Sequence, residues 1–214
     1  GIADEDFHDE AVSSLGQAFG SMVRERGGKR VSVGHDCRLS GPRIYDAFCK
    51  GILQAGTNVV GIGTVATPLT YFSEHHLNTD ASVSITGSHN PSNWNGFKFT
   101  VSKGALFGED IQEIRTRSSQ TQASAQRGSF EALDIQEAYI EHVLSTLRPL
   151  TQDVTVVCDA GSGMAGPIAP TLYERMGAKV LPLYCEADGR FPYHHPDPTE
   201  EENLQDLRST LATS

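Results

Sequence analysis

Residues 80–101 read DASVSITGSHNPSNWNGFKFTV and decide what fold we expect. Strand-like apolar segments lie at 80–85 and 97–101, and the polar stretch 86–98 runs from the first into the beginning of the second. Earlier in the chain, short apolar segments at 31–35 and 58–63 alternate with helical patterns. Strands that alternate with helices predict an α/β class with mixed, mostly parallel sheets.

The helical patterns separate these strands. Apolar residues recur at helical spacing over 9–26. Ser40 is placed to cap a second helix, Thr67-Pro68 opens a third, and a shorter one passes through Ile111 and Ile114. Further along, the sequence predicts helices at 134–147 and 167–176, strands at 154–158 and 179–185, and a helix opened by a capping box of Thr199 and Glu202.

A change of composition divides the chain. Residues 117–129, RSSQTQASAQRGS, hold no large apolar residue and are typical of a loop or linker. We therefore predict two related three-layer α/β/α domains, residues 1–133 with four strands and residues 134–214 with two. A parallel pair of strands buries its faces poorly, so the second domain is expected to be incomplete and the chain to be part of a longer protein.

Composition excludes several classes of partner. The 214 residues carry 17 basic and 27 acidic side chains, a net charge of -10, which argues against a nucleic-acid or anionic-membrane surface. No apolar stretch is long enough for a membrane span, and the acidic start is not a secretory signal. The cysteines form no C-x-x-C pair, which favours free thiols in a reducing cytoplasm over disulfides or a metal site: Cys37, Cys49, Cys158 and Cys185.

The loop at 86–98 is the densest polar stretch. Gly87 gives backbone freedom to a turn that presents Ser88, His89 follows directly, and Lys98 lies further along. A serine, an imidazole and an ammonium at a strand end suit phosphate or acyl chemistry. The same composition also fits an ordinary polar turn.

A second stretch, GSGMAG at 161–166, matches the G-x-G-x-x-G pattern and is followed by Glu186. A nicotinamide site in an oxidoreductase is one interpretation. A tight turn without nucleotide is the other interpretation. The negative charge of Asp159, just before the motif, would repel a pyrophosphate, and Pro167 and Pro170, just after it, lack the N–H groups that a phosphate would bind.

Two further loops carry charged residues. GHDCRLSG, residues 34–41, is either a helix-start turn with an Asp36–Arg38 ion pair or a loop beside the active cleft. DGRFPYHHPDPTEEEN, residues 188–203, is either a metal site at His194, His195 and Asp197 or a rigid X-Pro-rich loop.

Taken together, these motifs resemble the α-D-phosphohexomutases, most closely the bacterial phosphomannomutase/phosphoglucomutase branch. TGSHNP, NGFK and Thr67-Pro68 match the family, and GHDCRLSG resembles its G-x-D-x-R-x-S-G. DAGSGMAG resembles D-x-G-N-G-x-A-G, with Ser162 where Asn is usual, and FPYHHPDPTEEEN resembles the family's F-P-N-H-H-P-D-P loop. The resemblance covers nearly the whole chain.

The resemblance implies the first two of four domains, trimmed at both ends, in a cytoplasmic enzyme that is a monomer or a dimer. It implies that Ser88 carries a phosphoryl group, which passes to a mannose or glucose phosphate and forms a hexose 1,6-bisphosphate. His89 and Lys98 are the expected catalytic helpers. Mg²⁺ is the expected cofactor, with Ser88 phosphate as one ligand and aspartates beyond this segment as the others. This segment alone is expected to be inactive.

Two alternatives to a mutase remain. One is the NAD(P)-binding oxidoreductase based on GSGMAG, and the other is a non-catalytic module that binds sugar phosphates.

Overall fold

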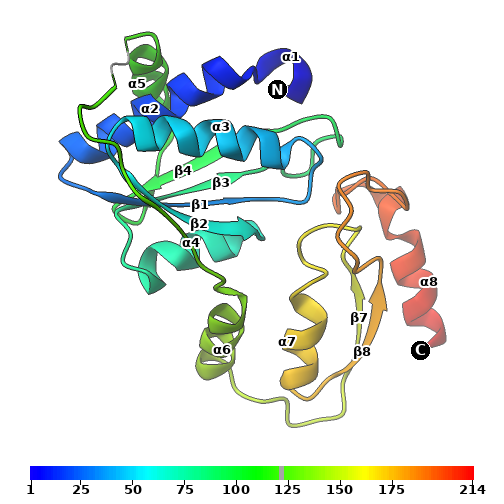
Figure 1. Ribbon diagram of the computed structural model, residues 1–214. Coiled ribbons are helices and arrows are strands. Elements are labelled where there is room, and N and C mark those ends of the chain that lie inside the picture. The colour runs from blue at the N-terminus through cyan, green and yellow to red at the C-terminus, as the bar shows by residue number, and fades with distance from the viewer. Residues whose placement is uncertain (121–122) are drawn as a thin grey trace. The chain divides into compact units, whose positions relative to one another are not determined.

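The computed structural model describes residues 1–120 and 123–214, which form two compact units (Figure 1). Unit 1 comprises Gly1–Asp36, Ser40–Gly87 and Asn93–Ile135. Unit 2 comprises Gln136–Ser214 and two short segments from earlier in the chain, Cys37–Leu39 and Ser88–Ser92. The segment Ser88–Ser92, which we call the serine loop, thus follows a strand of unit 1 but belongs to unit 2. A domain boundary between residues 133 and 134 stays a prediction.

Within its described residues, unit 1 contains a six-stranded sheet in the order β5-β4-β3-β1-β2-β6. The strands β1, β2, β3 and β6 run parallel, whereas β4 is antiparallel to both of its neighbours. Their bounds are β1 Arg30–His35, β2 Asn58–Thr64, β3 Ala81–Ile85, β4 Phe97–Val101, β5 Gly104–Ala105 and β6 Phe130–Ala132. The predicted mixed, mostly parallel sheet is therefore confirmed.

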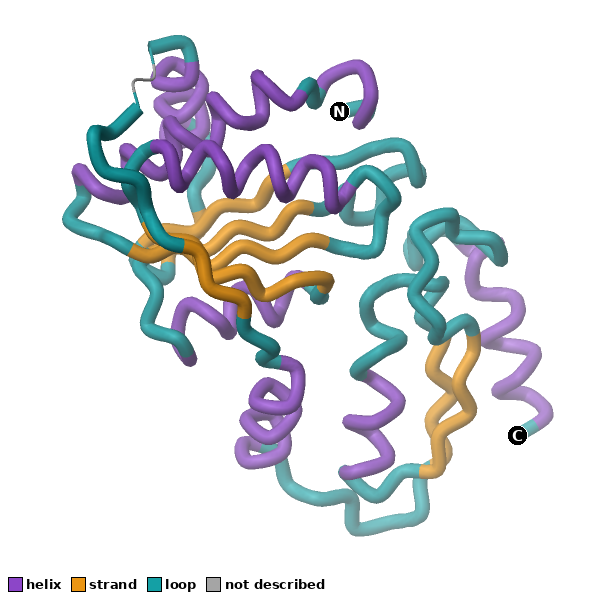
Figure 2. Tube along the Cα trace, in the orientation of Figure 1, coloured by secondary structure: helices purple, strands orange, loops and turns teal. Residues whose placement is uncertain are grey.

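One face of this sheet carries the apolar core. Alternate strand residues such as Val33, Val83 and Phe99 pack with Phe19 and Phe48 from the helices above them. These helices are α2 (Asp9–Glu25), α3 (Gly41–Gln54) and α5 (Glu109–Ser118), and α4 (Thr67–His76) lies on the other face (Figure 2). A short helix α1, Ala3–Asp6, precedes them.

Hydrogen bonds of hydroxyl groups join the other face of the sheet to α4. Ser73 of α4 donates a 2.6 Å hydrogen bond to Ser32 of β1. The carboxylate of Glu74, also on α4, accepts hydrogen bonds from Ser82 and Thr100 and is almost completely buried. Because buried polar groups are costly without partners, this network fixes α4 in one position on the sheet.

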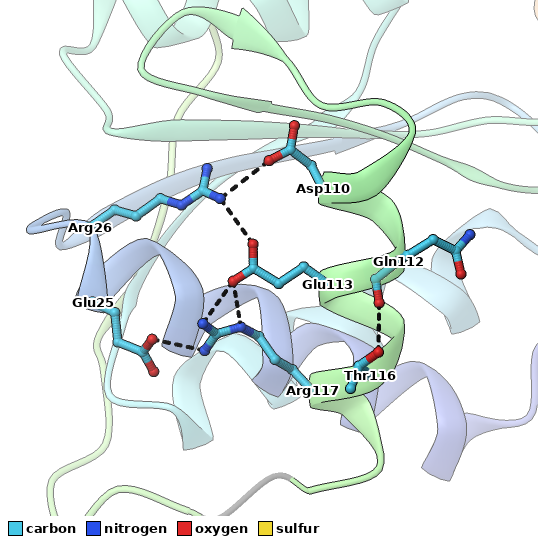
Figure 3. Close-up of polar contacts among 7 residues, drawn as sticks. All are labelled: Glu25, Arg26, Asp110, Gln112, Glu113, Thr116 and Arg117. Atoms are coloured by element: carbon cyan, nitrogen blue, oxygen red, sulfur yellow. Dashed lines mark hydrogen bonds and ion pairs between the residues drawn. The ribbon is translucent and has the colours of Figure 1, made fainter.

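An exposed ion network joins α5 to the end of α2 (Figure 3). Arg26 lies 3.3 Å from Asp110 and 3.2 Å from Glu113. Arg117 lies 2.8 Å from Glu25 and 2.7 Å from Glu113. Surface ion pairs contribute little to stability, so the apolar contacts of α5 hold it more strongly than these charges do.

Unit 2 is built on a smaller sheet. Within its described residues, β7 (Thr155–Asp159) and β8 (Lys179–Leu183) form a parallel two-stranded sheet. The sheet contacts α7 (Ala169–Arg175) and α8 (Gln205–Thr213), and α6 (Gln136–Thr146) contacts α7. No residue of either strand is fully buried. This is the poor burial expected of a two-stranded parallel unit.

Several predicted details were wrong. Unit 1 has two more strands than expected, because β5 and β6 are too short to show alternation. Thr199 is not a cap: its hydroxyl donates to Asp197, and the segment begins as a 3-10 helix, Glu201–Leu204, before α8. Ser40 does precede α3, but its side chain makes no cap bond there and instead accepts a hydrogen bond from Asn95.

The linker prediction was right only in part. Residues 117 and 118 end helix α5, and residues 121–122 lie outside the described residues. All four cysteines are free thiols, as expected. Among the helices of the described chain, none combines the length and apolar character that a bilayer crossing requires.

Candidate functional site: the serine loop

Ser88 is exposed and has a left-handed backbone. It follows the buried strand β3 through Thr86 and Gly87, and its φ is 55°. A left-handed conformation costs a residue with a side chain roughly 1–2 kcal/mol. Such a conformation persists only where the surrounding structure enforces it, and strained residues of this kind cluster at functional sites.

Arg38 supplies much of that enforcement. Its side chain is only 1% exposed, and Nη2 donates 2.8 Å hydrogen bonds to the carbonyl oxygens of Ser88 and Asn90. Nη1 donates to the carbonyl oxygen of Pro91. Three carbonyl groups of the serine loop therefore converge on one guanidinium. Arg38 of GHDCRLSG thus contacts the loop that carries Ser88, and whether this stretch lies beside an active cleft stays a prediction.

The segment around Gly189 closes over Arg38. A Cβ atom built on Gly189 would lie 2.7 Å from the Cα atom of Arg38, so only glycine allows this approach. Two residues on, the ring of Phe191 lies with its centroid 5.2 Å from the guanidinium carbon, within range of a cation–π contact. The backbone and ring of this segment explain how a charged side chain becomes buried.

His89 is held by the histidine-rich loop, residues 188–203. Its Nδ1 lies 2.7 Å from the carbonyl oxygen of Pro196, and because a carbonyl only accepts, Nδ1 carries the hydrogen. Nε2 is then the proton-accepting nitrogen whenever the ring is neutral. Hydrogen bonds from Thr199, aided by the charges of His89 and His195, lower the pKa of the neighbouring Asp197.

Lys98 belongs to unit 1, whereas Ser88 and His89 belong to unit 2. It lies on β4 opposite Ser84 and is exposed. The structure thus places Ser88 and His89 on one loop of unit 2 and places Lys98 on the sheet of unit 1.

The GSGMAG turn has a packing explanation. A Cβ atom on Gly166 would lie 2.8 Å from the Cα atom of Cys185 and closer still to its carbonyl group. Before it, Oδ1 of Asp159 accepts a 2.8 Å hydrogen bond from the Gly161 amide, which closes the turn without a ligand. Ser162 has a φ of 57°, and its buried hydroxyl has no hydrogen-bond partner in the described chain.

His194 is paired with Asp159. Nε2 of His194 lies 3.0 and 3.1 Å from the two carboxylate oxygens, and Nδ1 lies 2.9 Å from the His195 carbonyl oxygen. Burial alone lowers the pKa of this ring, but these acceptors outweigh burial and raise the pKa above its usual value. Both nitrogens face acceptors, so the geometry suits a protonated ring rather than a metal ligand.

The residues present do not make a magnesium site. Across residues 1–120 and 123–214, no group of three or more histidine, cysteine, aspartate or glutamate side chains could hold a metal ion. Ser88 offers one oxygen, whereas Mg²⁺ prefers octahedral oxygen coordination.

Sequence reasoning missed Phe191, Gly189 and the contact of His89 with Pro196. It placed Arg38 either in an ion pair with Asp36 or on a loop beside the active cleft, and did not predict its contact with the Ser88 loop. The signal available for Arg38 was its place at the carboxyl end of β1, beside β3, which carries the serine loop.

Models of one protein family match most of this chain. A family model described as phosphoglucomutase/phosphomannomutase, alpha/beta/alpha domain I, matches residues 1–125, and the model of domain II matches residues 137–214.

Curated relatives agree. A phosphomannomutase/phosphoglucomutase from Pseudomonas putida is 40% identical over 207 residues, which are 97% of this chain and 44% of the relative. A phosphoglucomutase from Neisseria meningitidis serogroup B is 39% identical over 99% of this chain and 46% of its own length. The chain thus spans less than half the length of these relatives.

Solved structures are also similar. A phosphoglucomutase/phosphomannomutase family protein from Burkholderia thailandensis matches with a TM-score of 0.94 and 37% identity, over 100% of this chain and 48% of that one. Because the two family models match residues 1–125 and 137–214, the chain belongs to the phosphoglucomutase/phosphomannomutase family and has its first two α/β/α domains.

Proposed function

We propose that the protein is a phosphohexomutase that interconverts the 1- and 6-phosphates of mannose, glucose or both. The observation that carries the proposal is the exposed, left-handed Ser88, whose loop is fixed by a buried arginine. The relatives named phosphomannomutase or phosphoglucomutase support the substrate class. Ser88 is the proposed phosphoryl carrier.

The proposed reaction has two transfers. In the first, a hydroxyl oxygen of the sugar monophosphate attacks the phosphorus on Ser88, the bond from phosphorus to Oγ breaks, and the hydroxyl proton leaves. A hexose 1,6-bisphosphate results. After the sugar turns over, Oγ of Ser88 loses its proton and attacks the other phosphorus, the bond from that phosphorus to the sugar oxygen breaks, and the sugar oxygen takes up a proton. Such transfers depend mainly on positioning and on neutralising charge.

His89 and Lys98 have distinct proposed roles. Nε2 of a neutral His89 can accept the proton that leaves during transfer, because Nδ1 is already committed to Pro196. The Lys98 ammonium is proposed to neutralise phosphate charge. Lys98 lies on the sheet of unit 1, so the conformation of the serine loop in unit 2 does not bear on this assignment.

The cofactor, the cellular location and the oligomeric state are also proposals. Mg²⁺ is the proposed cofactor, and within this chain only the Ser88 phosphate is proposed to contact it. We propose a cytoplasmic protein that is a monomer or a dimer, with hexose phosphates and the bisphosphate as its small-molecule partners.

The test compares Ser88→Ala with Ser92→Ala in the complete gene product. Both serines are exposed on the same loop. With glucose 1-phosphate or mannose 1-phosphate, primed by the matching 1,6-bisphosphate, Ser88→Ala should abolish 6-phosphate formation and Ser92→Ala should retain it. Full activity of Ser88→Ala would refute the proposed carrier.

A further inference from the structure

Arg38 is a buried cation whose guanidinium donates hydrogen bonds to an exposed loop. Ser88, Asn90 and Pro91 are exposed as residues, yet the guanidinium that binds their carbonyl oxygens is 1% exposed. A buried charge without partners is strongly unfavourable, so these hydrogen bonds are needed for Arg38 to occupy its position. The loop conformation and the buried arginine therefore depend on each other.

The shape of the side chain matters as well as its charge. A guanidinium is planar and presents its donors in a fixed arrangement, so one group can bind several carbonyls at set angles. Here Nη2 binds two of them and Nη1 binds the third, while Phe191 lies near the guanidinium carbon. The compact ammonium of a lysine cannot reproduce that arrangement.

The contact acts on the residue whose backbone is strained. Arg38 binds the carbonyl of Ser88 itself, and this bond restrains the peptide unit that follows its unfavourable φ of 55°. The hydrogen bonds to Asn90 and Pro91 restrain the next part of the loop. His89, between them, is tied separately to Pro196. Because the peptide unit after Ser88 and the three residues that follow are held, the direction in which Oγ of Ser88 leaves the loop is restricted.

We propose that Arg38 is a positioning residue for phosphoryl transfer, which holds the Ser88 loop in the geometry that presents Oγ to the substrate. This inference rests on the proposed function. It assigns Arg38 no contact with substrate. A misplacement of about 1 Å in a reacting group can cost about a hundredfold in rate, so loosening this loop should act on the chemical step.

The test compares Arg38→Lys with Arg190→Lys. Arg190 lies in the same unit, but its side chain is 72% exposed and pairs with Asp188, so its variant controls for loss of a guanidinium. Two measurements are made on each variant: kcat and KM for the hexose phosphate, and amide hydrogen exchange of residues 88–90 and 92.

We expect Arg38→Lys to lower kcat by about tenfold to a hundredfold, with KM changed by less than about threefold. Loop exchange should accelerate at least about tenfold, while exchange in β7 and β8 stays as in the parent protein. Arg190→Lys should change neither measurement. Unchanged loop exchange in a folded Arg38→Lys protein would overturn the proposal, as would an unchanged kcat.

If Arg38→Lys does not fold, Phe191→Leu replaces it. That variant removes the ring near the guanidinium and keeps the hydrogen bonds. It should lower kcat and accelerate loop exchange, each by less than Arg38→Lys would. Loop exchange and kcat equal to those of the parent protein would refute the proposal. If the parent protein neither turns over nor carries phosphate, the proposed function fails, and the exchange measurement alone decides whether Arg38 holds the loop.

Discussion

Nε2 of His194 lies 3.0 Å from Oδ1 of Asp159, and this pair joins the histidine-rich loop to the end of β7. The pKa of His194 in the folded protein is raised because the acceptors around it outweigh the effect of burial. Asp206 adds to this effect, and the ring of Tyr184 packs edge-on against the imidazole. Protonation of His194 therefore favours the folded state.

The first prediction is that stability decreases as pH rises. A raised folded pKa gives a stabilisation that is complete below the unfolded value of about 6.5 and is lost as pH rises through the folded pKa. Urea unfolding between about pH 5.5 and 8.5 should show this loss in the parent protein. Asp159→Asn should flatten it, and Asp153→Asn, at an exposed site of the same unit, should not. Parent-like pH dependence in Asp159→Asn would contradict the assignment.

The second prediction concerns the glycine turn. Gly166→Ala should lower the free energy of unfolding by about 1–3 kcal/mol, because the new Cβ would overlap the backbone of Cys185. Gly163→Ala is the matched control from the same turn, since its Cβ would meet only the Ala160 carbonyl oxygen, at 3.1 Å. Urea denaturation measures both variants. Equal losses would show that the close approach at Gly166 does not limit this turn.

The third prediction separates the forces that hold α5. Ile114 is 1% exposed, so Ile114→Ala should cost about 2–5 kcal/mol of unfolding free energy. Glu113→Gln removes the acid that both arginines contact in Figure 3, yet it should cost less than about 1 kcal/mol. That smaller loss should shrink further in about 1 M salt, where screening is strong. A larger loss for Glu113→Gln would reverse this account.

The fourth prediction concerns magnesium. Residues 1–214 should show no saturable Mg²⁺ binding at micromolar concentrations by calorimetry, because Ser88 offers a single ligand to a strongly hydrated ion. The complete gene product should lose mutase activity to a chelator and regain it with added Mg²⁺. If residues 1–214 instead bind Mg²⁺ tightly and lose that binding when acidic side chains of this chain are replaced, that result contradicts the prediction and places the metal site within residues 1–214.

Much of the fold could be predicted from the sequence because its long elements repeat regularly. The patterns at 9–26 and 97–101 correspond to α2 and β4. The predictions that failed concern short strands, the ends of elements and a side chain that bonds to another partner. Strand β8 stops at Leu183 rather than at residue 185 because Tyr184 turns to a φ of 51°. Thr199 bonds to Asp197, so a capping pattern in the sequence did not become a cap.

The site was predictable to a smaller extent. The catalytic roles of Ser88 and His89 stay predictions. That these residues lie on an exposed loop follows from their place after a buried strand, a rule that depends only on local order. The burial of Arg38 does not, because it needs Phe191 and Gly189, which lie far away along the chain. No local pattern encodes a contact between segments so distant in sequence. The pairing of His194 with Asp159 was missed for the same reason.

The measurement that tests the central claim most directly is the location of phosphate in the complete gene product. The protein would be incubated with glucose 1,6-bisphosphate or mannose 1,6-bisphosphate, and its peptides mapped by mass spectrometry. The account predicts one phosphoryl group, on Ser88, that is lost when glucose 1-phosphate or mannose 1-phosphate is added in excess. Phosphate on another residue, together with full turnover by Ser88→Ala, would contradict it.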